Sequence, residues 1–438
     1  METKLIRIAE IAKEKPKDVF TSLYHLLNTK LLTQCHNELA GNKARGIDDV
    51  TKLEYSTNLE ENIQSLVERL KKHSYKPQAV RRVYIPKGDG KKKRPLGIPA
   101  YEDKIVQSGL NKILQAIYEP SFSNNSYGFR PERSCHQAIV KLNSIIEHKK
   151  INYIVDADIK GFFNNVDHEW IIKCIDLRIK DPNIIKLIKK FLKAGVMEEG
   201  IIQKTNVGMP QGSIISPILS NIYLHYVLDL WFEVKIRRQS TGEARIVRYA
   251  DDYVCCFQYE KDAKLFYEKL KDRLAKFNLE IEESKTKIIM FGRFAEERCK
   301  INKQNIVPTF DFLGFTHYCS KSKNGKFRVK RRTSKKKFRE KLKNFKEWIK
   351  AVRNLYKLQK IFEVAKLKLR GHYRYYGITD NSPMLKEFKY QIEGLLFKWL
   401  NRRSQRKSFD RYKFNLYLKL NPLPTPKIYV NIYNNAVF

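Results

Sequence analysis

Two acidic segments of the chain could bind divalent metal ions. Asp251 and Asp252 stand between residues 245–249 and 253–257, two runs rich in β-branched and aromatic residues, which predicts a β-hairpin with the acidic pair at its tip. At about 4 Å and an effective dielectric near 20, two such charges repel by roughly 4 kcal/mol, so a rigid pair favours a nearby cation. Oxygen ligands of this kind suit Mg²⁺. Because Asp is also common in tight turns, a purely structural role is the alternative.

The second acidic segment lies upstream. Apolar residues lead into Asp156 and Asp158, which predicts a buried strand that delivers a carboxylate where it ends. Alternate residues of a strand face the same side, so spacing alone does not choose between the two. Two-metal phosphoryl transfer requires carboxylates around ions about 3.5–4 Å apart. The two segments together therefore predict a two-metal centre for phosphoryl transfer.

The order of these motifs resembles the catalytic core of reverse transcriptases. Asp158 with an aromatic residue, Phe163, at the fifth following position, and then Tyr249-Ala250-Asp251-Asp252, is most similar to group II intron-encoded reverse transcriptases (maturases) and their bacterial relatives. The resemblance extends over roughly residues 45–430. It implies two Mg²⁺ ions, with Mn²⁺ as an alternative, held mainly by Asp158 and Asp251, with Asp252 tuning the site.

The resemblance also implies a set of residues that contact the incoming nucleotide. Phe163 would pack beneath the sugar and favour deoxynucleotides, with ordinary core packing as its alternative. Residues 83–99 predict a hairpin around a basic turn, whose Lys87 and Arg94 would contact the triphosphate unless the turn is merely solvated. Lys285 resembles a lysine that approaches the nucleotide as a proton donor.

A further nucleotide-binding segment is Gly208–Pro217, which predicts a turn that opens a helix running to about Trp231. In the family this segment lies against template and nucleotide, which implies a binding role for Gln211 and Gly212. Helix capping is the alternative for both residues.

Nucleic-acid contacts are expected from basic side chains in two regions. Arg130 and Arg133 lie in a segment that the family also carries, and they would either follow the template backbone or brace the fingers. In the C-terminal part, basic residues alternate with aromatic ones, a pattern that can pair phosphates and stack bases. The candidates there are Arg370, Arg374, Tyr375, Arg402, Arg403, Arg406 and Lys407.

The composition favours a polyanionic partner. The 438 residues carry a formal net charge of +39, a field that concentrates polyanions and speeds their capture. Residues 321–438 hold 33 Lys and Arg against 7 Asp and Glu, which is +26 of that total. No apolar run approaches the roughly 18 residues that a membrane-spanning helix needs. Nucleic acid is therefore favoured over a membrane surface.

The cysteines and the N-terminal residues predict the cellular compartment of the protein. The seven cysteines are scattered and form no Cys-x-x-Cys pair, which is typical of free thiols in a reducing compartment. The N-terminal residues lack the apolar core of a secretion signal. The expected location is the bacterial cytoplasm, in association with the nucleoid or with RNA.

The fold class that the resemblance implies is α+β, a right-hand polymerase with fingers, a palm with an antiparallel sheet, and an α-helical thumb or maturase (X) domain. Periodicity predicts helices over residues 57–73, 102–118, 261–277, 355–370 and 383–403. No Cys pairs or His-Asn-His-like run follow, so the endonuclease domain of some relatives is expected to be missing. The expected boundaries are 1–56 for an N-terminal helical extension, 57–319 for fingers and palm, 320–403 for the thumb and 404–438 for a basic C-terminal segment.

The function that the resemblance implies is RNA-directed DNA polymerisation by a protein encoded in a group II intron. Such a protein would also assist splicing and mobility by binding its structured intron RNA. Its partners would be an RNA template, a DNA primer or target and deoxynucleoside triphosphates, with the oligomeric state left open. Two alternatives remain: a domesticated enzyme in defence or DNA repair, and an RNA-binding splicing factor with a vestigial polymerase, against which the intact carboxylates argue.

Overall fold

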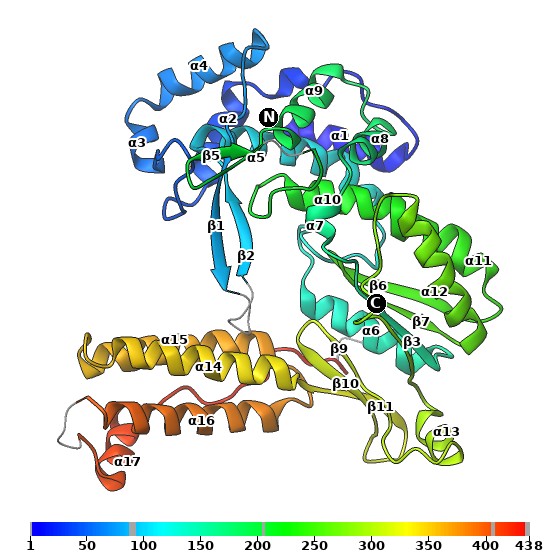
Figure 1. The fold of residues 1–438 in the computed structure, drawn as a ribbon, viewed down its shortest axis with the longest axis vertical. Helices are drawn as coiled ribbons and strands as arrows, with labels where there is room; N and C mark the ends of the chain where they lie inside the picture. Colours follow the sequence, from blue (N-terminus) through cyan, green and yellow to red (C-terminus); the bar gives the residue numbers. More distant parts are fainter. Residues whose placement is uncertain (1, 87–92, 204–205, 404–407, 434–438) are drawn as a thin grey trace. The chain divides into compact units, whose positions relative to one another are not determined.

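The computed structural model describes residues 2–86, 93–203, 206–403 and 408–433. The chain divides into two compact units, each built from several segments. The first unit comprises residues 1–138, 155–255 and 260–288, and the second comprises residues 139–154, 256–259 and 289–438. Both units are mixtures of helices and sheets (Figure 1).

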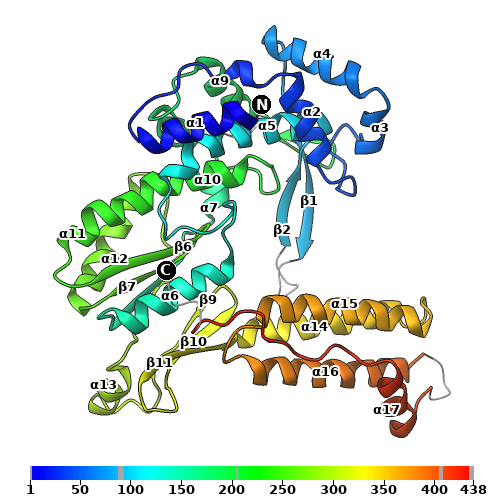
Figure 2. The same ribbon diagram turned by 180° about the vertical axis from the view of Figure 1, so that it is seen from behind.

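The first unit is built around a long buried helix, α5 (Tyr101–Tyr118). Its Ile105, Leu110 and Ile113 are fully buried, and helices α1 and α2 both pack on it (Figure 2). The other helices of this unit are α1 (Glu2–Glu14), α2 (Thr29–Glu38), α3 (Lys52–Thr57), α4 (Leu59–Lys71), α7 (Phe162–Asn165), α8 (His168–Asp176), α9 (Pro182–Leu192), α10 (Ser216–Leu224), α11 (Arg237–Gln239) and α12 (Glu260–Ala275).

One sheet of the first unit has the strand order β2-β1-β4-β5. Strands β1 and β2 form the antiparallel hairpin expected over residues 83–99, with Ile85 opposite Arg94. Strand β4 pairs with β1 in parallel and with β5 antiparallel. The bounds of these strands are β1 (Val80–Pro86), β2 (Lys93–Ile98), β4 (Val196–Glu198) and β5 (Ile201–Gln203).

The sheet that carries the acidic segments has the strand order β6-β7-β3-β8. Strands β6 (Ala244–Tyr249) and β7 (Asp252–Phe257) form the predicted hairpin, and β3 (Tyr153–Ala157) lies next to β7. Strand β7 is buried along almost its whole length, because Val254, Cys255 and Cys256 are fully covered. Strand β8 (Lys287–Met290) completes the sheet.

The second unit combines a small antiparallel sheet with a helical layer. Strand β10 lies between β9 and β11. The buried core of the helices includes Phe345, Ile361 and Leu385, from three helices that lie side by side (Figures 1 and 2). The elements are α13 (Ala295–Ile301), β9 (Phe310–Phe312), β10 (Phe315–Lys321), β11 (Phe327–Thr333), α14 (Lys335–Val352), α15 (Leu358–Tyr376), α16 (Ser382–Leu400) and α17 (Arg411–Leu420). Helix α6 (Cys135–His148) has residues in both units.

The start of α8 and the state of the cysteines are both well defined. Asp167 caps α8, accepting hydrogen bonds from the backbone N–H groups of Glu169 (2.8 Å) and Trp170 (3.1 Å). All seven cysteines are free. The helix expected to run to Trp231 differs, because α10 ends at Leu224 and continues as two π-helical turns to Ile236. Within the part of the chain that the structure describes, no helix is long and apolar enough to cross a membrane.

The buried Asp103 of α5 makes stability depend on pH. Burial raises the pKa of its carboxyl to about 7, although hydrogen bonds from Tyr75 and from the backbone N–H of Gln78 oppose the rise. Between the ordinary carboxyl pKa of 3.8 and about 7, the unfolded chain therefore releases a proton that the folded chain keeps.

The free energy of unfolding should consequently decrease as the pH rises through this range, because this contribution is complete only below the unfolded pKa. Asp103→Asn should remove that part of the pH dependence, which denaturant titrations of both proteins between about pH 4 and pH 8 would measure. Identical pH profiles for the two proteins would contradict the assignment.

Candidate active site

The structure brings the two acidic segments together at one end of the β6-β7-β3-β8 sheet. Only Ala250 and Asp251 separate β6 from β7, and Asp252 is the first residue of β7. Asp158 directly follows β3, the neighbour of β7. The predicted carboxylates therefore leave adjacent strands at the same end of the sheet, and Asp158 and Asp251 interact electrostatically.

Groups of both charge signs act on the carboxyl of Asp251. Burial raises the pKa of its carboxyl, and the negative charge of Asp158 acts in the same direction. The backbone N–H of Asp251 and the cations Arg94 and Arg248 oppose this rise. Arg94, predicted as a nucleotide contact, thus lies close enough to the acidic turn to act on it electrostatically.

Lys285, the predicted proton donor, contacts the same site. Its ammonium group donates a hydrogen bond to Oδ2 of Asp158, which raises the pKa of Lys285. The backbone on either side is fixed as well, because the N–H of Glu282 donates to the carbonyl of Asp158 at 2.8 Å. Asp158, Asp251, Arg94 and Lys285 therefore form one cluster of charged groups.

A fully buried ion pair lies beneath the acidic turn. The guanidinium of Arg248 donates to both carboxylate oxygens of Asp229, at 2.8 and 2.6 Å, and neither side chain is more than 2% exposed. It also donates to Oδ1 of Asn221 (3.0 Å) and to the carbonyl of Ala250 (2.9 Å). Since Ala250 has a φ of +58°, which L-residues rarely adopt, this bond holds the turn in a strained conformation.

Sequence reasoning did not find the pair of Arg248 and Asp229, although a signal was present. Arg248 stands inside an apolar strand segment, and Asp229 stands in a largely apolar helical run. A charge at a position that must be buried requires a buried partner. The sequence thus indicated two unmatched charges, but not that they meet.

The segment that contains Arg130 braces the turn from the other side. Gly128 is essential there, because a Cβ atom at this position would lie 2.2 Å from the backbone nitrogen of Ala250. Arg130 is buried and ion-paired with Glu119 (2.8 Å), and it donates to the carbonyl of Ser126 at 2.7 Å. These contacts hold the guanidinium of Arg130 between Glu119 and its own loop.

Arg133, the second candidate of this segment, is half-buried. Its guanidinium lies over the ring of Tyr127, 5.6 Å from the centroid, and contacts the side-chain oxygen of Asn124 at 3.2 Å. Its packing is thus with the same loop that braces the acidic turn.

A pocket in the first unit collects two of the predicted nucleotide-binding residues. Phe163 and Gln211 both line a cavity of about 270 Å³. Backbone pairing positions them, because the N–H of Met209 donates to the carbonyl of Phe163 at 2.7 Å. The remaining lining residues are Arg82, Tyr84, Pro95, Asn164, Val196, Val207, Gly208, Met209 and Pro210.

Gly212 allows the turn of the second nucleotide-binding segment to lie directly on strand β2. The N–H of Gly97 donates to the carbonyl of Gln211 at 2.6 Å. A Cβ atom on Gly212, whose φ is +106°, would approach the carbonyl oxygen of Gly97 to 2.9 Å. A larger residue would therefore disturb the contact between this turn and the β1–β2 hairpin.

The basic candidates of the second unit divide by exposure. Arg370, Arg374 and Arg402 are exposed, with Arg402 lying over the ring of Trp399. Arg403 is half-buried and donates to the carbonyl of Tyr356 at 2.9 Å. Tyr375 packs inward, stacking on Phe315 and donating to the carbonyl of Leu313. Lys87, Arg406 and Lys407 lie outside the described residues.

The donor set of the site fits a hard divalent cation. Carboxylate oxygens are the ligands that Mg²⁺ accepts, and a cation would offset the burial and the repulsion that raise the pKa of Asp251. Among the described residues, no three or more His, Cys, Asp or Glu side chains form a cluster that could hold a metal ion. Such a site suits an ion that completes its shell with water and substrate oxygens.

Comparison with known proteins identifies the family. Residues 85–317 match the family model "Reverse transcriptase (RNA-dependent DNA polymerase)". The chain is 37% identical over 307 residues to "Group II intron-encoded protein LtrA" of Lactococcus lactis subsp. cremoris, an alignment that covers 67% of this chain and 50% of that protein. It is 33% identical over 302 residues to "Protein YkfC" of Escherichia coli (strain K12), covering 60% of this chain and 79% of that protein.

A further relative is the "Uncharacterized 91 kDa protein in cob intron" of Schizosaccharomyces pombe, 37% identical over 261 residues, with 56% of this chain and 32% of that protein covered. The chain thus spans about half the length of the first of these relatives. The family match contains the acidic hairpin, Asp158 and Lys285. The chain therefore belongs to the reverse transcriptase family.

Proposed function

We propose that this protein is an RNA-directed DNA polymerase that transfers nucleotides with the help of two divalent ions. The observation that carries the proposal is the cluster of Asp158 after β3, Asp251 in the β6–β7 turn, Lys285 before β8 and Arg94 on β2. Membership of the reverse transcriptase family supports the same reaction. The cluster combines carboxylates that can hold ions with cations that can meet a triphosphate.

Asp158 and Asp251 would hold Mg²⁺ ions, with Asp252 adjusting the site from the first position of β7. Bound ions would supply charge stabilisation for the attacking and leaving oxygens. Lys285 is protonated in its contact with Asp158, so it can hold a proton for the leaving pyrophosphate. Arg94 would add bidentate contacts to the phosphates, and Lys87 is proposed for the same role.

The pocket lined by Phe163 and Gln211 is proposed to contact the sugar and the template side of the nucleotide. An aromatic side chain beneath the sugar leaves no room for a 2′-hydroxyl, so deoxynucleotides would be preferred. In this reading the β1–β2 hairpin belongs to the fingers, the β6-β7-β3-β8 sheet to the palm, and helices α14–α16 to the thumb or maturase domain of a right-hand polymerase.

Binding of structured intron RNA is proposed as a second activity of the same protein. It is supported by the relative that is named a group II intron-encoded protein and by the +26 charge of residues 321–438. The exposed Arg370, Arg374 and Arg402 are candidates for phosphate contacts. DNA primer or target, RNA template and deoxynucleoside triphosphates complete the proposed partners.

Primer extension on an RNA template tests the proposal and its metal requirement together. The protein should extend an annealed DNA primer with deoxynucleotides, lose this activity when divalent ions are chelated, and regain it when Mg²⁺ or Mn²⁺ is restored. Ribonucleotides should extend the primer far less efficiently. Extension that persists at the same rate in excess chelator would contradict the proposed use of ions, and absence of extension with either ion would contradict the polymerase assignment.

A further inference from the structure

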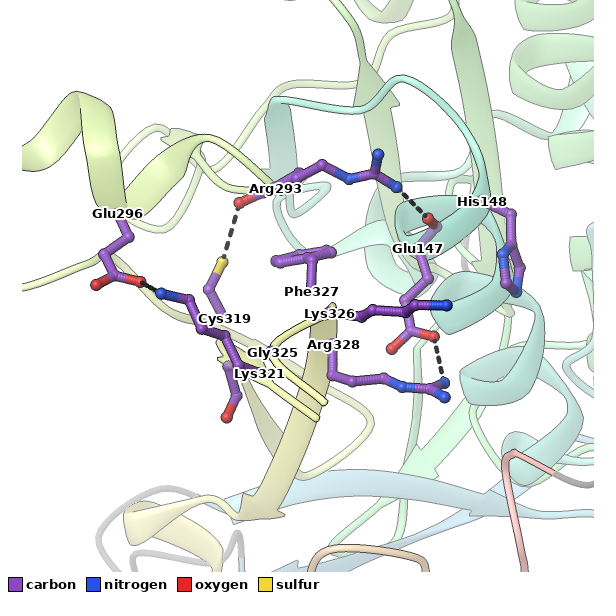
Figure 3. A pocket seen from close by; sticks show the side chains of 12 residues that line it. Glu147, His148, Arg293, Glu296, Cys319, Lys321, Gly325, Lys326, Phe327 and Arg328 are labelled. Carbon is purple, nitrogen blue, oxygen red and sulfur yellow. Dashed lines mark hydrogen bonds and ion pairs between the residues drawn. The ribbon is translucent and has the colours of Figure 1, made fainter. Parts of the chain in front are cut away.

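A polar pocket of about 600 Å³ lies wholly within the second unit (Figure 3). It is formed by the last turn of α6, the segment before and at the start of α13, and the hairpin of β10 and β11. Its volume lies within the range of ordinary small-ligand sites, about 300–1,000 Å³. The lining residues are Glu147, His148, Gly292, Arg293, Glu296, Cys319, Ser320, Lys321, Gly325, Lys326, Phe327 and Arg328.

The lining carries more positive than negative charge. Four Lys and Arg side chains face two Glu side chains, an excess of two positive charges. Both carboxylates are already matched, Glu147 by Arg328 at 3.1 Å and Glu296 by Lys321 at 3.2 Å. The excess therefore resides on Arg293 and Lys326.

The two cations that carry the excess lie on segments whose backbone contacts are defined. Arg293 donates a hydrogen bond to the backbone carbonyl of Glu147 at 3.5 Å, and its guanidinium carries further N–H groups that can meet a ligand. Lys326 closes a tight turn, since its backbone N–H donates to Oγ of Ser322 (3.2 Å) and its carbonyl accepts from the N–H of Ser322 (2.8 Å).

An aromatic ring lies among these charges. Figure 3 shows the ring of Phe327 in the pocket, with Arg293 on one side and Lys326 and Arg328 on the other. Phe327 is the first residue of β11 and is only half-buried. A partly exposed ring surrounded by cations offers a stacking surface for a flat group that carries negative charge, which is the chemistry of a nucleotide.

We infer that this pocket binds one nucleotide of a single-stranded nucleic acid, with its base on Phe327 and its phosphate between Arg293 and Lys326. A strand is favoured over a free nucleotide because a net charge of +39 concentrates polyanions far more than small anions. A single strand is favoured over a duplex because only an unpaired base can stack on a side chain. The site goes beyond the proposed polymerase reaction, which uses residues of the first unit.

The total affinity for nucleic acid cannot locate the site, because basic residues elsewhere in the protein also contribute to it. Photo-crosslinking identifies the peptide that contacts the base directly. The probe is an octamer of uridylate with one 5-iodouridine, made as RNA and as DNA and used with chelator and without nucleotides, so that failure of polymerase activity cannot affect the result. Irradiation should crosslink the base to the peptide that contains Phe327, and comparison of the two probes assigns RNA or DNA as the source.

Two double variants separate this pocket from the general field of the protein. Arg293→Ala with Lys326→Ala should raise the probe concentration for half-maximal crosslinking about tenfold and flatten the dependence of log affinity on log salt by about 0.7, which is one phosphate contact on a single strand. Lys303→Ala with Lys323→Ala removes two exposed charges of the same unit outside the pocket and should change neither value.

Three results would overturn the inference. The first is the absence of crosslinks on the β10–β11 hairpin with either probe. The second is an equal loss of affinity in the two double variants, which would assign the binding to the overall charge. The third is competition by uridine monophosphate as effective as that by unmodified octamer at the same nucleotide concentration, which would replace the strand by a free nucleotide.

Discussion

Asp251→Asn should reduce primer extension by about a thousandfold or more, while the free energy of unfolding stays the same or increases. The loss follows from losing a carboxylate that would hold an ion, because several kcal/mol of transition-state stabilisation correspond to about three powers of ten in rate. Stability should not suffer, because burial and Asp158 already disfavour the charged form of Asp251. Single-turnover extension and denaturant unfolding of the same preparations measure both effects.

Two further variants define what this result means. Asp158→Asn should cause a similar loss, whereas Asp156→Asn, two residues earlier on β3, is the matched control and should retain most of the activity. The choice between these two aspartates could not be made from spacing, and the contact of Asp158 with Lys285 now favours Asp158. Wild-type extension by Asp251→Asn, or equal losses in both β3 variants, would contradict the assignment.

Much of the candidate site could be predicted because its signals are local. A run of β-branched and aromatic residues on either side of Ala250 and Asp251 predicts a hairpin without reference to the rest of the chain. Asp167 is a typical N-cap residue, because its side chain accepts hydrogen bonds from backbone N–H groups only two and three residues ahead, and α8 begins at the next residue. Helix α5 is likewise defined by the spacing of its own apolar residues.

The surroundings of several candidate side chains could not be predicted, because residue type and spacing do not show which partner a side chain meets. Arg130 looks like a candidate for phosphate binding until Glu119 and the carbonyl of Ser126 are found beside it. Tyr375, a candidate for base stacking in the second unit, stacks on Phe315 in the structure. Residue type alone does not show whether a basic or aromatic side chain faces solvent or packs against a buried partner.

The buried pair of Arg248 and Asp229 should be worth more to the protein's activity than to its stability. Asp229→Ala should lower the free energy of unfolding by about 3–5 kcal/mol, because it leaves a guanidinium buried without its carboxylate. In Arg248→Met with Asp229→Leu, apolar side chains replace both charges, so most of that stability should return. Extension should not return, because the carbonyl of the strained Ala250 loses its donor and the acidic turn is no longer held.

This double variant separates positioning from folding. If it unfolds at the same denaturant concentration as the wild type but extends primers at least about tenfold more slowly at saturating nucleotide, the pair acts on the carboxylates through the turn. The control is Arg245→Met. Arg245 lies on β6, as Arg248 does, but its ion pair with Glu243 is more exposed, so its loss should change the free energy of unfolding by no more than about 1 kcal/mol and leave extension unaltered. Recovery of both stability and extension in the double variant would contradict this positioning role, because apolar side chains of similar volume would then hold the turn as well as the ion pair does.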